Sequence, residues 1–308
     1  MFCQGSVSRI LQKPREALLQ IHTKKTEQTG SVNKPEVLAV PCNVTDMDAV
    51  QNLWNTAKNT FGSVDIWINN AGVNQPDKPV YLLTAQEIEF MLDTDLKGTI
   101  WGSKVAFAGM KEQGFGQIFN VEGYGSNDAM MTGLSIYGTT KRAVTYFTQA
   151  LAKESEDVTG GKVKVGRLAP GIMITDFLKT ANGGKTKVEL PEKTKKVYNI
   201  LGDYPETIVD YVVPKMIANR KNNARIIWLT NRRAFGRFLT AGFHKRDFFA
   251  NETNTDLQDH KSDARAEGEW LFENKRIFHT KSHQPEKGSG KCAGKRKLCL
   301  SELYPAGW

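Results

Sequence analysis

Residues 120–141 of this 308-residue chain read NVEGYGSNDAMMTGLSIYGTTK, and the stretch ends in a tyrosine and a lysine four positions apart, Tyr137 and Lys141. The residues that follow have the spacing of an amphipathic helix, so the phenol and the ammonium would lie on one helix face. A cation close to a phenol lowers its pKa from the ordinary value of about 10. Such a pair can exchange a proton with an alcohol or carbonyl oxygen near neutral pH. Because the same spacing also arises by chance on helix surfaces, the rest of the chain must support this interpretation.

Short apolar runs alternate with helical patterns on both sides of this stretch. The runs have the composition of buried parallel strands, and they span residues 37–44, 64–70, 117–121, 162–168 and 224–229. Thr45 is expected to cap the helix after the first run, and residues 82–110 have helical spacing. The alternation predicts an α/β fold, a doubly wound parallel sheet of the Rossmann-like type with helices on both faces.

Small and polar residues follow several of these predicted strands. Asn70 and Gly72 follow the second run, residues 120–126 the third, and Pro170-Gly171 the fourth. Parallel sheets bind their ligands at the carboxyl ends of the strands. We therefore expect these residues to converge on one edge of the sheet, beside Tyr137.

Three motifs in this order and at these distances resemble the short-chain dehydrogenase/reductase family. They are Asn70-Ala71-Gly72, Tyr137-x-x-x-Lys141, and Pro170-Gly171 with Thr175. The segments IFNVEGYGS and PGIMITDFL resemble those of one subgroup, the chlorophyll(ide) b reductases of plants and algae and their bacterial relatives. The similarity runs from about residue 14 to about residue 276.

The resemblance implies carbonyl reduction with NADP(H) or NAD(H). Tyr137 would protonate the carbonyl oxygen, while Lys141 would lower the pKa of the phenol and hold the nicotinamide ribose. The cofactor would also contact Asn43, Asn70, Ala71, Gly72, Pro170, Gly171, Ile172 and Thr175. Asn43 stands where the family usually has an aspartate that reads the adenine amino group, and an amide oxygen can accept the same hydrogen bond.

The catalytic serine of the family is displaced in this chain. Its usual position holds Tyr124, and Glu122-Gly123 replaces the usual serine pair. Ser126 is the nearest hydroxyl, and we expect it to donate a hydrogen bond to the substrate oxygen; Ser135 is a weaker candidate. Asp95 stands where an asparagine usually maintains a proton relay to the lysine. It could accept hydrogen bonds in that relay or be structural only.

The glycine-rich turn TGxxxGxG, which opens the family fold and binds the cofactor pyrophosphate, does not occur before Asn70. Residues 14–22 match the second helix of the family, so the first strand, the glycine turn and the first helix are expected to be missing. We therefore expect the chain as written to bind NADPH weakly or not at all. A truncated gene model or a non-catalytic paralogue would explain this departure.

The composition of the chain bears on which partners, metal sites and membrane segments are expected. The formal charge of +9 favours anionic ligands, but no nucleic-acid-binding signature occurs, so no nucleic acid partner is expected. The four scattered cysteines predict neither a disulfide scaffold nor a metal site. No apolar run approaches the roughly 18 residues that a membrane-spanning helix needs.

Two domains are expected, an incomplete short-chain dehydrogenase/reductase domain over residues 1–278 and a basic, disordered tail over 279–308. Residues 176–201 occupy the position of the family's substrate lid. Residues 232–243 mix arginines with phenylalanines. This segment could contact a large planar or membrane-embedded substrate, or it could be an amphipathic helix whose arginines lie over a core edge.

Three functions remain open. The first is reduction of the 7-formyl group of chlorophyll(ide) b to a hydroxymethyl group, the second is the same chemistry on a small alcohol or ketone, and the third is a non-catalytic paralogue. The expected partners are a small-molecule or pigment substrate, a second copy of the chain in a homo-oligomer, and peripheral contact with a membrane. In a phototroph the protein would lie in the chloroplast, in the stroma or on the thylakoid surface, and otherwise in the cytoplasm.

Overall fold

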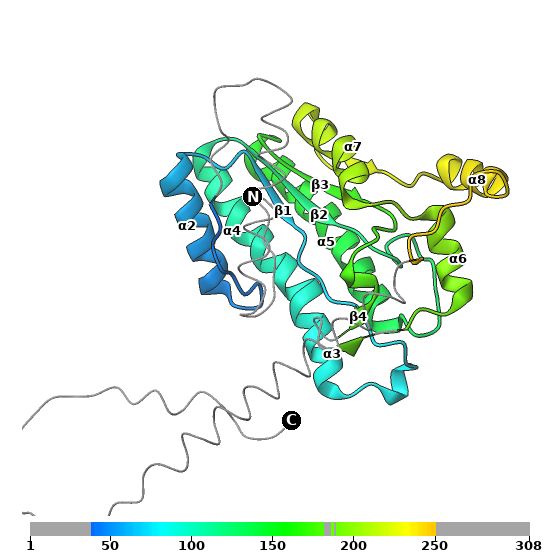
Figure 1. Ribbon diagram of the computed structural model, residues 1–308. Helices are drawn as coiled ribbons and strands as arrows, with labels where there is room; N and C mark the ends of the chain where they lie inside the picture. Colours follow the sequence, from blue (N-terminus) through cyan, green and yellow to red (C-terminus); the bar gives the residue numbers. More distant parts are fainter. Residues whose placement is uncertain (1–37, 182–185, 188, 251–308) are drawn as a thin grey trace, which may run out of the picture. The chain divides into compact units, whose positions relative to one another are not determined.

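A parallel sheet forms the centre of the computed structural model, which describes residues 38–181, 186–187 and 189–250 (Figure 1). The strands are β1 (Ile66–Asn69), β2 (Gly116–Val121), β3 (Val163–Ala169) and β6 (Arg225–Ile227), and they lie in the order β1-β2-β3-β6. All neighbouring pairs are parallel. This arrangement confirms the predicted α/β fold with a doubly wound sheet.

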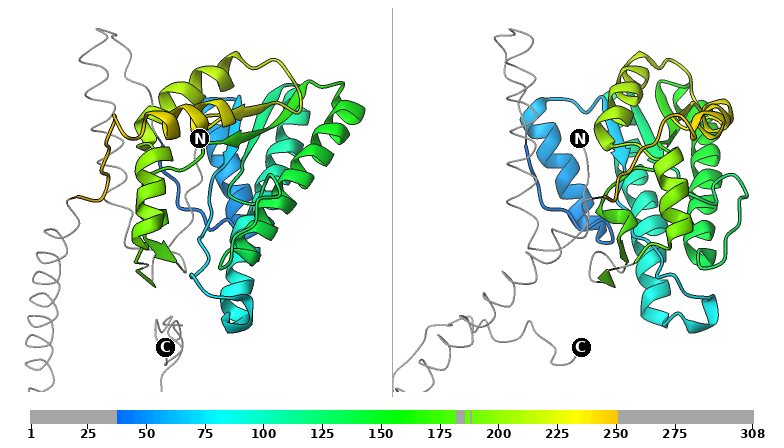
Figure 2. Two further views of the ribbon diagram at one scale, coloured as in Figure 1. Left: turned by 90° about the vertical axis from the view of Figure 1, so that its right-hand side faces the viewer. Right: turned by 45° about the vertical axis from the view of Figure 1, so that its right-hand side comes forward.

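Helices cover both faces of the sheet (Figure 2). On one face lie α2 (Met47–Phe61), α4 (Gly98–Gln113) and α5 (Ser135–Thr159), whose apolar residues form a core with Trp67 and Ile118. On the other face α7 (Pro205–Ala218) packs on Ile68 and Phe119, the next residues along the same strands. Successive strand side chains point to opposite faces. The nearly continuous apolar runs are therefore needed to fill both cores.

The predicted helix over residues 82–110 consists of several pieces. A 3-10 turn, η1 (Val80–Leu82), precedes α3 (Ala85–Met91), and a π-helical segment, η2 (Leu92–Lys97), joins α3 to α4. Thr84 starts α3 with a capping box, because its hydroxyl accepts from the Glu87 N–H while the Glu87 carboxylate accepts from the Thr84 N–H.

The remaining elements follow β3 in the sequence. They are η3 (Asp176–Leu178), a two-stranded sheet of β4 (Thr180–Ala181) and β5 (Thr186–Lys187), and the helices α6 (Glu192–Leu201) and α8 (Asn231–Thr240). The expected lid, residues 176–201, therefore contains a 3-10 turn, a short hairpin and a helix.

Two predictions near the start of the described chain are wrong. The described part of the run 37–44, residues 38–44, is not a strand, because no described strand lies beside it to supply hydrogen bonds. Its side chains nonetheless pack on the core through Val40 and Cys42. The cap of α2 is Asp46 rather than Thr45, since the Asp46 carboxylate accepts from the N–H groups of the first turn.

A buried network of polar side chains connects the sheet to the helices on one of its faces. Asn69 donates to Ser103 Oγ at 3.0 Å and to Asn120 Oδ1 at 2.7 Å, and Asn120 donates to Thr148 at 2.9 Å. The contacts link β1 and β2 to α4 and α5. Gly102 leaves room for them, because a Cβ there would lie 2.0 Å from Asn69 Oδ1.

Several predictions lie outside the described residues. These are the helix at residues 14–22, the absence of a first strand and glycine turn, and the boundary between domain and tail at 278/279. Within the ranges that the structure describes, no helix is both long and apolar enough to cross a membrane.

Candidate active site

Tyr137 and Lys141 lie together at the start of α5, and both side chains are buried. The Lys141 ammonium is 5.4 Å from the centre of the Tyr137 ring, and the ring of Phe177 lies 6.1 Å away on the lid side. The phenol hydroxyl rests against the backbone of Gly123, where a Cβ would lie 2.4 Å from the hydroxyl oxygen. The structure thus brings together the two residues that the sequence pairs.

The pKa of Tyr137 is raised, whereas the sequence predicted that Lys141 would lower it. Burial is the largest cause, and the negative charge of Asp95 and the nearby Tyr198 raise the pKa further. Desolvation penalises the phenolate, and the charge of Lys141 at this distance does not compensate for it. The phenol therefore carries its proton at neutral pH.

Asp95 lies in the π-helical segment η2, a feature often found at functional sites. It is fully buried, with one oxygen 3.8 Å from Lys141 Nζ and the other accepting from the Val73 N–H at 2.7 Å. Thr140 donates to the carboxylate at 3.5 Å. The pKa of Asp95 is raised overall, because the effect of burial exceeds the opposing effects of Lys141 and the two donors. Asp95 is therefore both the counter-ion of Lys141 and a structural acceptor.

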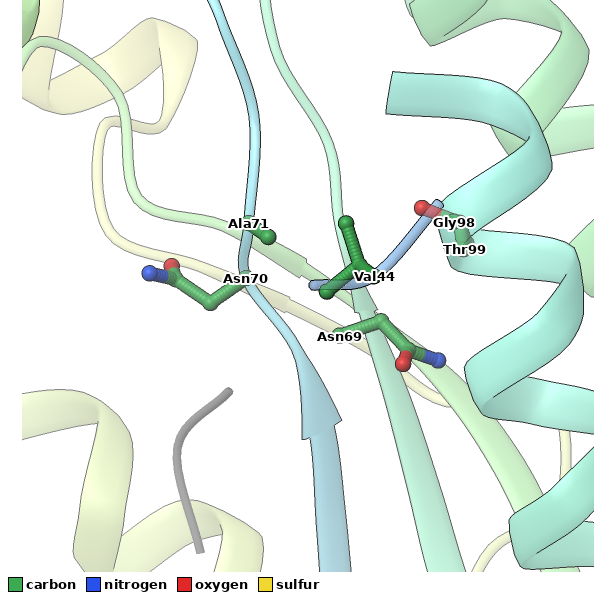
Figure 3. Close-up of a pocket in the computed structure, with 6 residues that line it drawn as sticks. All are labelled: Val44, Asn69, Asn70, Ala71, Gly98 and Thr99. Atoms are coloured by element: carbon green, nitrogen blue, oxygen red, sulfur yellow. The ribbon is translucent and has the colours of Figure 1, made fainter. Parts of the chain in front are cut away.

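The turn after β1 lies beside this pair. Gly72 is close to both charges, since a Cβ there would lie 3.4 Å from Lys141 Nζ and 3.4 Å from Asp95 Oδ1. A small pocket at this turn is lined by Val44, Asn69, Asn70, Ala71, Gly98 and Thr99 (Figure 3). Asn70 is exposed and its side chain points away from α4, whereas Asn69 points towards that helix (Figure 3). The buried amide is thus Asn69, which the sequence analysis did not select.

Asn43 is exposed just before α2. Its amide oxygen already accepts two hydrogen bonds from Thr45, from the N–H at 3.1 Å and from the hydroxyl at 3.0 Å. Both lone pairs of that oxygen are used, so it is poorly placed to accept from an adenine amino group. The amide nitrogen remains as a donor.

The loop after β3 carries the last predicted group of cofactor residues. Gly171 has a left-handed φ of 74°, and a Cβ there would lie 2.6 Å from the Leu229 side chain. The Ile172 carbonyl accepts from the Asp203 N–H at 3.0 Å, while Thr175 immediately precedes η3. Pro170 and its neighbours thus follow the carboxyl end of β3, as predicted.

Ser126, the displaced serine, lies near Tyr137 and Lys141, but its hydroxyl already forms hydrogen bonds with the backbone. Ser126 Oγ is 3.3 Å from the Lys141 carbonyl, to which it donates, and it accepts from the Gly123 N–H at 3.1 Å. Tyr124 is partly exposed, and its hydroxyl donates to the Met130 carbonyl at 3.0 Å. Ser126 therefore holds the loop against α5, and no described contact joins it to the Tyr137 hydroxyl.

Glu122, which replaces a serine of the family, has a different set of partners. The buried carboxylate pairs with Arg225 at 2.7 Å and with Arg167 at 3.6 Å, and it accepts from the Thr145 hydroxyl at 3.1 Å. These contacts join the end of β2 to β3, β6 and α5. Glu122 thus anchors the strand end that presents Gly123 to Tyr137.

Besides Asn69, three further residues near the site were not predicted from the sequence. The side-chain oxygen of the buried Gln75 accepts from the N–H groups of Ile136 and Tyr137, at 2.9 and 3.1 Å, and so caps α5 from another segment. Asn74 donates to the Phe177 carbonyl of the lid at 3.5 Å. Tyr198 of α6 is close enough to influence Tyr137. No local motif marks these residues, because their partners are distant in sequence.

Comparison with known proteins agrees with this geometry. The short chain dehydrogenase family matches residues 7–186. The probable chloroplastic chlorophyll(ide) b reductase of Oryza sativa subsp. japonica is 30% identical over 229 residues, which cover 74% of this chain and 43% of that protein. The chain thus spans less than half the length of this relative. Farnesol dehydrogenase of Aedes aegypti is 26% identical over 193 residues, 61% of this chain and 78% of its own.

A solved structure supports the fold. A metagenomic short-chain oxidoreductase in complex with NADP superimposes with a TM-score of 0.50 at 16% identity, covering 69% of this chain and 80% of that one. The matched family spans more than half of the chain and includes the Tyr137 and Lys141 pair. The chain therefore belongs to the short chain dehydrogenase family.

Proposed function

We propose that this protein is an NAD(P)H-dependent reductase that converts the 7-formyl group of chlorophyll(ide) b to a hydroxymethyl group. The observation that carries the chemistry is the buried, protonated Tyr137 beside Lys141. Similarity to a chlorophyll(ide) b reductase supports the substrate.

In this proposal Tyr137 would donate its proton to the carbonyl oxygen, and bound NAD(P)H would supply the hydride that reduces the carbonyl carbon. Lys141 would hold the nicotinamide ribose and keep a positive charge near the developing tyrosinate. Asp95 holds Lys141 through their ion pair and fixes the turn after β1 through Val73. Because Ser126 is bonded to the Lys141 carbonyl, its contribution as a donor to the substrate requires that bond to open.

The residues present fit the nicotinamide half of the cofactor. Gly72 has no side chain that would crowd Lys141, and Gly171 keeps the loop after β3 close to the strand end. The turn at Asn70 and Ala71, together with Pro170, Ile172 and Thr175, would line the cofactor. At the adenine end we propose that Asn43 donates through its amide nitrogen, since its oxygen is already occupied.

The protonation state of Tyr137 favours reduction. A protonated phenol is ready to donate to a carbonyl, whereas oxidation of an alcohol needs the phenolate as a base. Burial and Asp95 both disfavour the phenolate. We therefore expect the forward, reducing direction to dominate at neutral pH.

The same chemistry could act on a smaller substrate. Similarity to farnesol dehydrogenase supports a second candidate, oxidoreduction of a small alcohol or ketone. A purified protein that reduces small aldehydes but not chlorophyllide b would favour this candidate. In a phototroph we place the pigment reaction in the chloroplast, and we expect a homo-oligomer.

The test compares the wild-type chain with Tyr137→Phe, with NADPH and chlorophyllide b as substrates and absorbance of the product pigment as the readout. Loss of a general acid lowers the rate by about 100- to 10,000-fold. Tyr146→Phe is the matched control, because Tyr146 lies on the same helix and is exposed. When the wild type reduces the pigment at a measurable rate, an unchanged rate in Tyr137→Phe rules out the proposed proton donor. Failure of NADPH to quench or shift fluorescence on titration would instead support the non-catalytic paralogue.

A further inference from the structure

Helix α8 has its charged side inward and its apolar side outward. Arg233 and Arg237, four positions apart, face the body of the protein. The guanidinium of Arg233 lies 3.8 Å from the centre of the Trp228 ring, and that of Arg237 lies 2.6 Å from Asp203. A surface helix normally shows the reverse arrangement, with its apolar stripe on the core.

The opposite side of α8 is apolar and exposed. The side chains are Phe235, Phe238, Leu239 and Phe243, and between 51% and 89% of each is exposed. The first three recur at spacings of three and four, so they form one stripe, and Phe243 lies just beyond the end of the helix. We call these four residues the α8 stripe. Apolar side chains concentrated in this way mark interaction sites.

Asp203 prevents α8 from turning its stripe inward. The buried Asp203 carboxylate accepts from the Trp228 indole at 2.7 Å and pairs with both Arg237 and Arg246, the latter at 3.1 Å. Rotation of α8 would leave this carboxylate buried without Arg237, which is strongly unfavourable. The outward position of the α8 stripe is therefore built into the fold.

Charge identifies the partner. Residues 231–250 contain five basic side chains and one acidic side chain, namely Arg232, Arg233, Arg237, Lys245 and Arg246 against Asp247. Arg232 and Lys245 lie just before and just after the α8 stripe in the sequence, are exposed, and form no ion pair with a described residue. Aromatic and aliphatic side chains accompanied by cations are suited to the headgroup region of an anionic bilayer. We propose that the α8 stripe docks on an anionic lipid surface.

Docking there would bring a bilayer close to the site. Helix α6 contacts α8 and carries Tyr198, which lies near Tyr137. A carbonyl substrate dissolved in the membrane would then meet the lid side of the enzyme. This consequence rests on the proposed reductase function, whereas lipid binding itself does not.

Vesicle flotation with the full chain tests the proposal. One set of vesicles contains phosphatidylcholine alone, and the other contains phosphatidylcholine mixed with phosphatidylglycerol. The wild type should float with the mixed vesicles and bind neutral ones much more weakly. Phe238→Ser combined with Phe243→Ser should weaken binding about tenfold or more, and Arg232→Gln should weaken binding to the mixed vesicles about fivefold.

Controls place equal changes elsewhere on the surface. Tyr146→Ser removes an exposed aromatic residue and Lys153→Gln an exposed cation, both on α5, and both should bind as the wild type does. Phe243→Ser alone covers the case in which the double variant does not fold, since Phe243 lies beyond the helix. Equal flotation with both vesicle types, or wild-type binding by the α8 variants, overturns the proposal. A shift from dimer to monomer in these variants without loss of vesicle binding also overturns it and indicates a second copy as the partner.

Discussion

At the scale of single residues, the site depends on what surrounds one phenol. Gly123 leaves room for the Tyr137 hydroxyl, burial keeps that hydroxyl protonated, and Asp95 adds to this effect. Lys141 lies 3.8 Å from Asp95, so the negative charge of Asp95 offsets part of the stabilisation that Lys141 would give to a phenolate. The aspartate at this position therefore biases the pair towards proton donation.

Asp95→Asn should shift the pH dependence of the reaction. The negative charge of Asp95 raises the pKa of Tyr137, so its removal lowers that pKa. Reduction needs the protonated phenol, and its rate should start to fall at a lower pH than in the wild type. Alcohol oxidation needs the phenolate and should begin at a lower pH. Profiles of kcat/KM against pH in both directions measure the shift.

The control for this change is Asp93→Asn, which alters a partly exposed aspartate of the same π-helical segment that pairs with Lys97. Its profiles should coincide with those of the wild type. A shift of the Asp95→Asn limbs to higher pH contradicts the assigned role.

Gly123→Ser should inactivate the enzyme, although it introduces the residue type that the family commonly has there. The new Cβ would lie 2.4 Å from the Tyr137 hydroxyl and must displace it. A displacement of about 1 Å at a reacting group costs about 100-fold in rate. Steady-state reductase assays measure the loss. Gly236→Ser, placed where a Cβ meets nothing within 4 Å, is the matched control.

At the scale of the elements, helix α5 begins without a side-chain cap of its own. Gln75, on the loop after β1, supplies the acceptor for two of its first N–H groups. The helix N-terminus that positions Tyr137 is thus fixed to the same turn that borders Lys141 through Gly72. The loop after β1 therefore both positions Tyr137 and borders the charged group of Lys141.

Gln75→Ala should lower both stability and rate. It leaves the buried N–H of Tyr137 and the partly buried N–H of Ile136 without their acceptor, at a cost of about 1–3 kcal/mol in the free energy of unfolding. Urea unfolding measures the stability, and kcat measures the effect on Tyr137. Gln149→Ala, an exposed position on the same helix, should change neither. Equal values of both quantities in Gln75→Ala and the wild type would falsify the capping role.

The sequence predicted those elements whose signals are local. Apolar runs identified β1, β2, β3 and β6 because burial on both faces leaves a continuous pattern. The run at 37–44 has the same pattern, but a strand also needs a neighbour, which composition does not reveal. Tyr137 and Lys141 share one helical turn, so their proximity was predictable. Gln75 and Asn69 act through partners far along the chain, so neither role had a sequence signal.

At the scale of the whole described unit, polar contacts hold the sheet and its helices in one register. A hydrogen-bonded network next to the site joins two strands to two helices, through Asn69, Ser103, Asn120 and Thr148. Fully satisfied buried networks of this kind specify one arrangement of a core, and partly satisfied ones destabilise it. The site therefore rests on a rigid layer.

Asn120→Ala should destabilise this unit by about 2–4 kcal/mol, because it removes one of the two acceptors of the Asn69 amide and the donor to the Thr148 hydroxyl, and opens a cavity. Equilibrium urea unfolding gives the change in free energy. Asn127→Ala, on an exposed loop, is the control and should be neutral. A change below 0.5 kcal/mol at Asn120, the range of ordinary surface substitutions, contradicts the proposed importance of the network.

The parallel register has a consequence for how the chain reaches its native state. Neighbouring strands pair residues far apart in sequence, such as Asn69 and Asn120, which are 51 positions apart. Each pairing requires a long loop to close before any hydrogen bond forms, so sheets of this type fold slowly and expose apolar strand edges on the way. Refolding from urea should therefore take milliseconds to seconds or longer, with yields that fall as protein concentration rises.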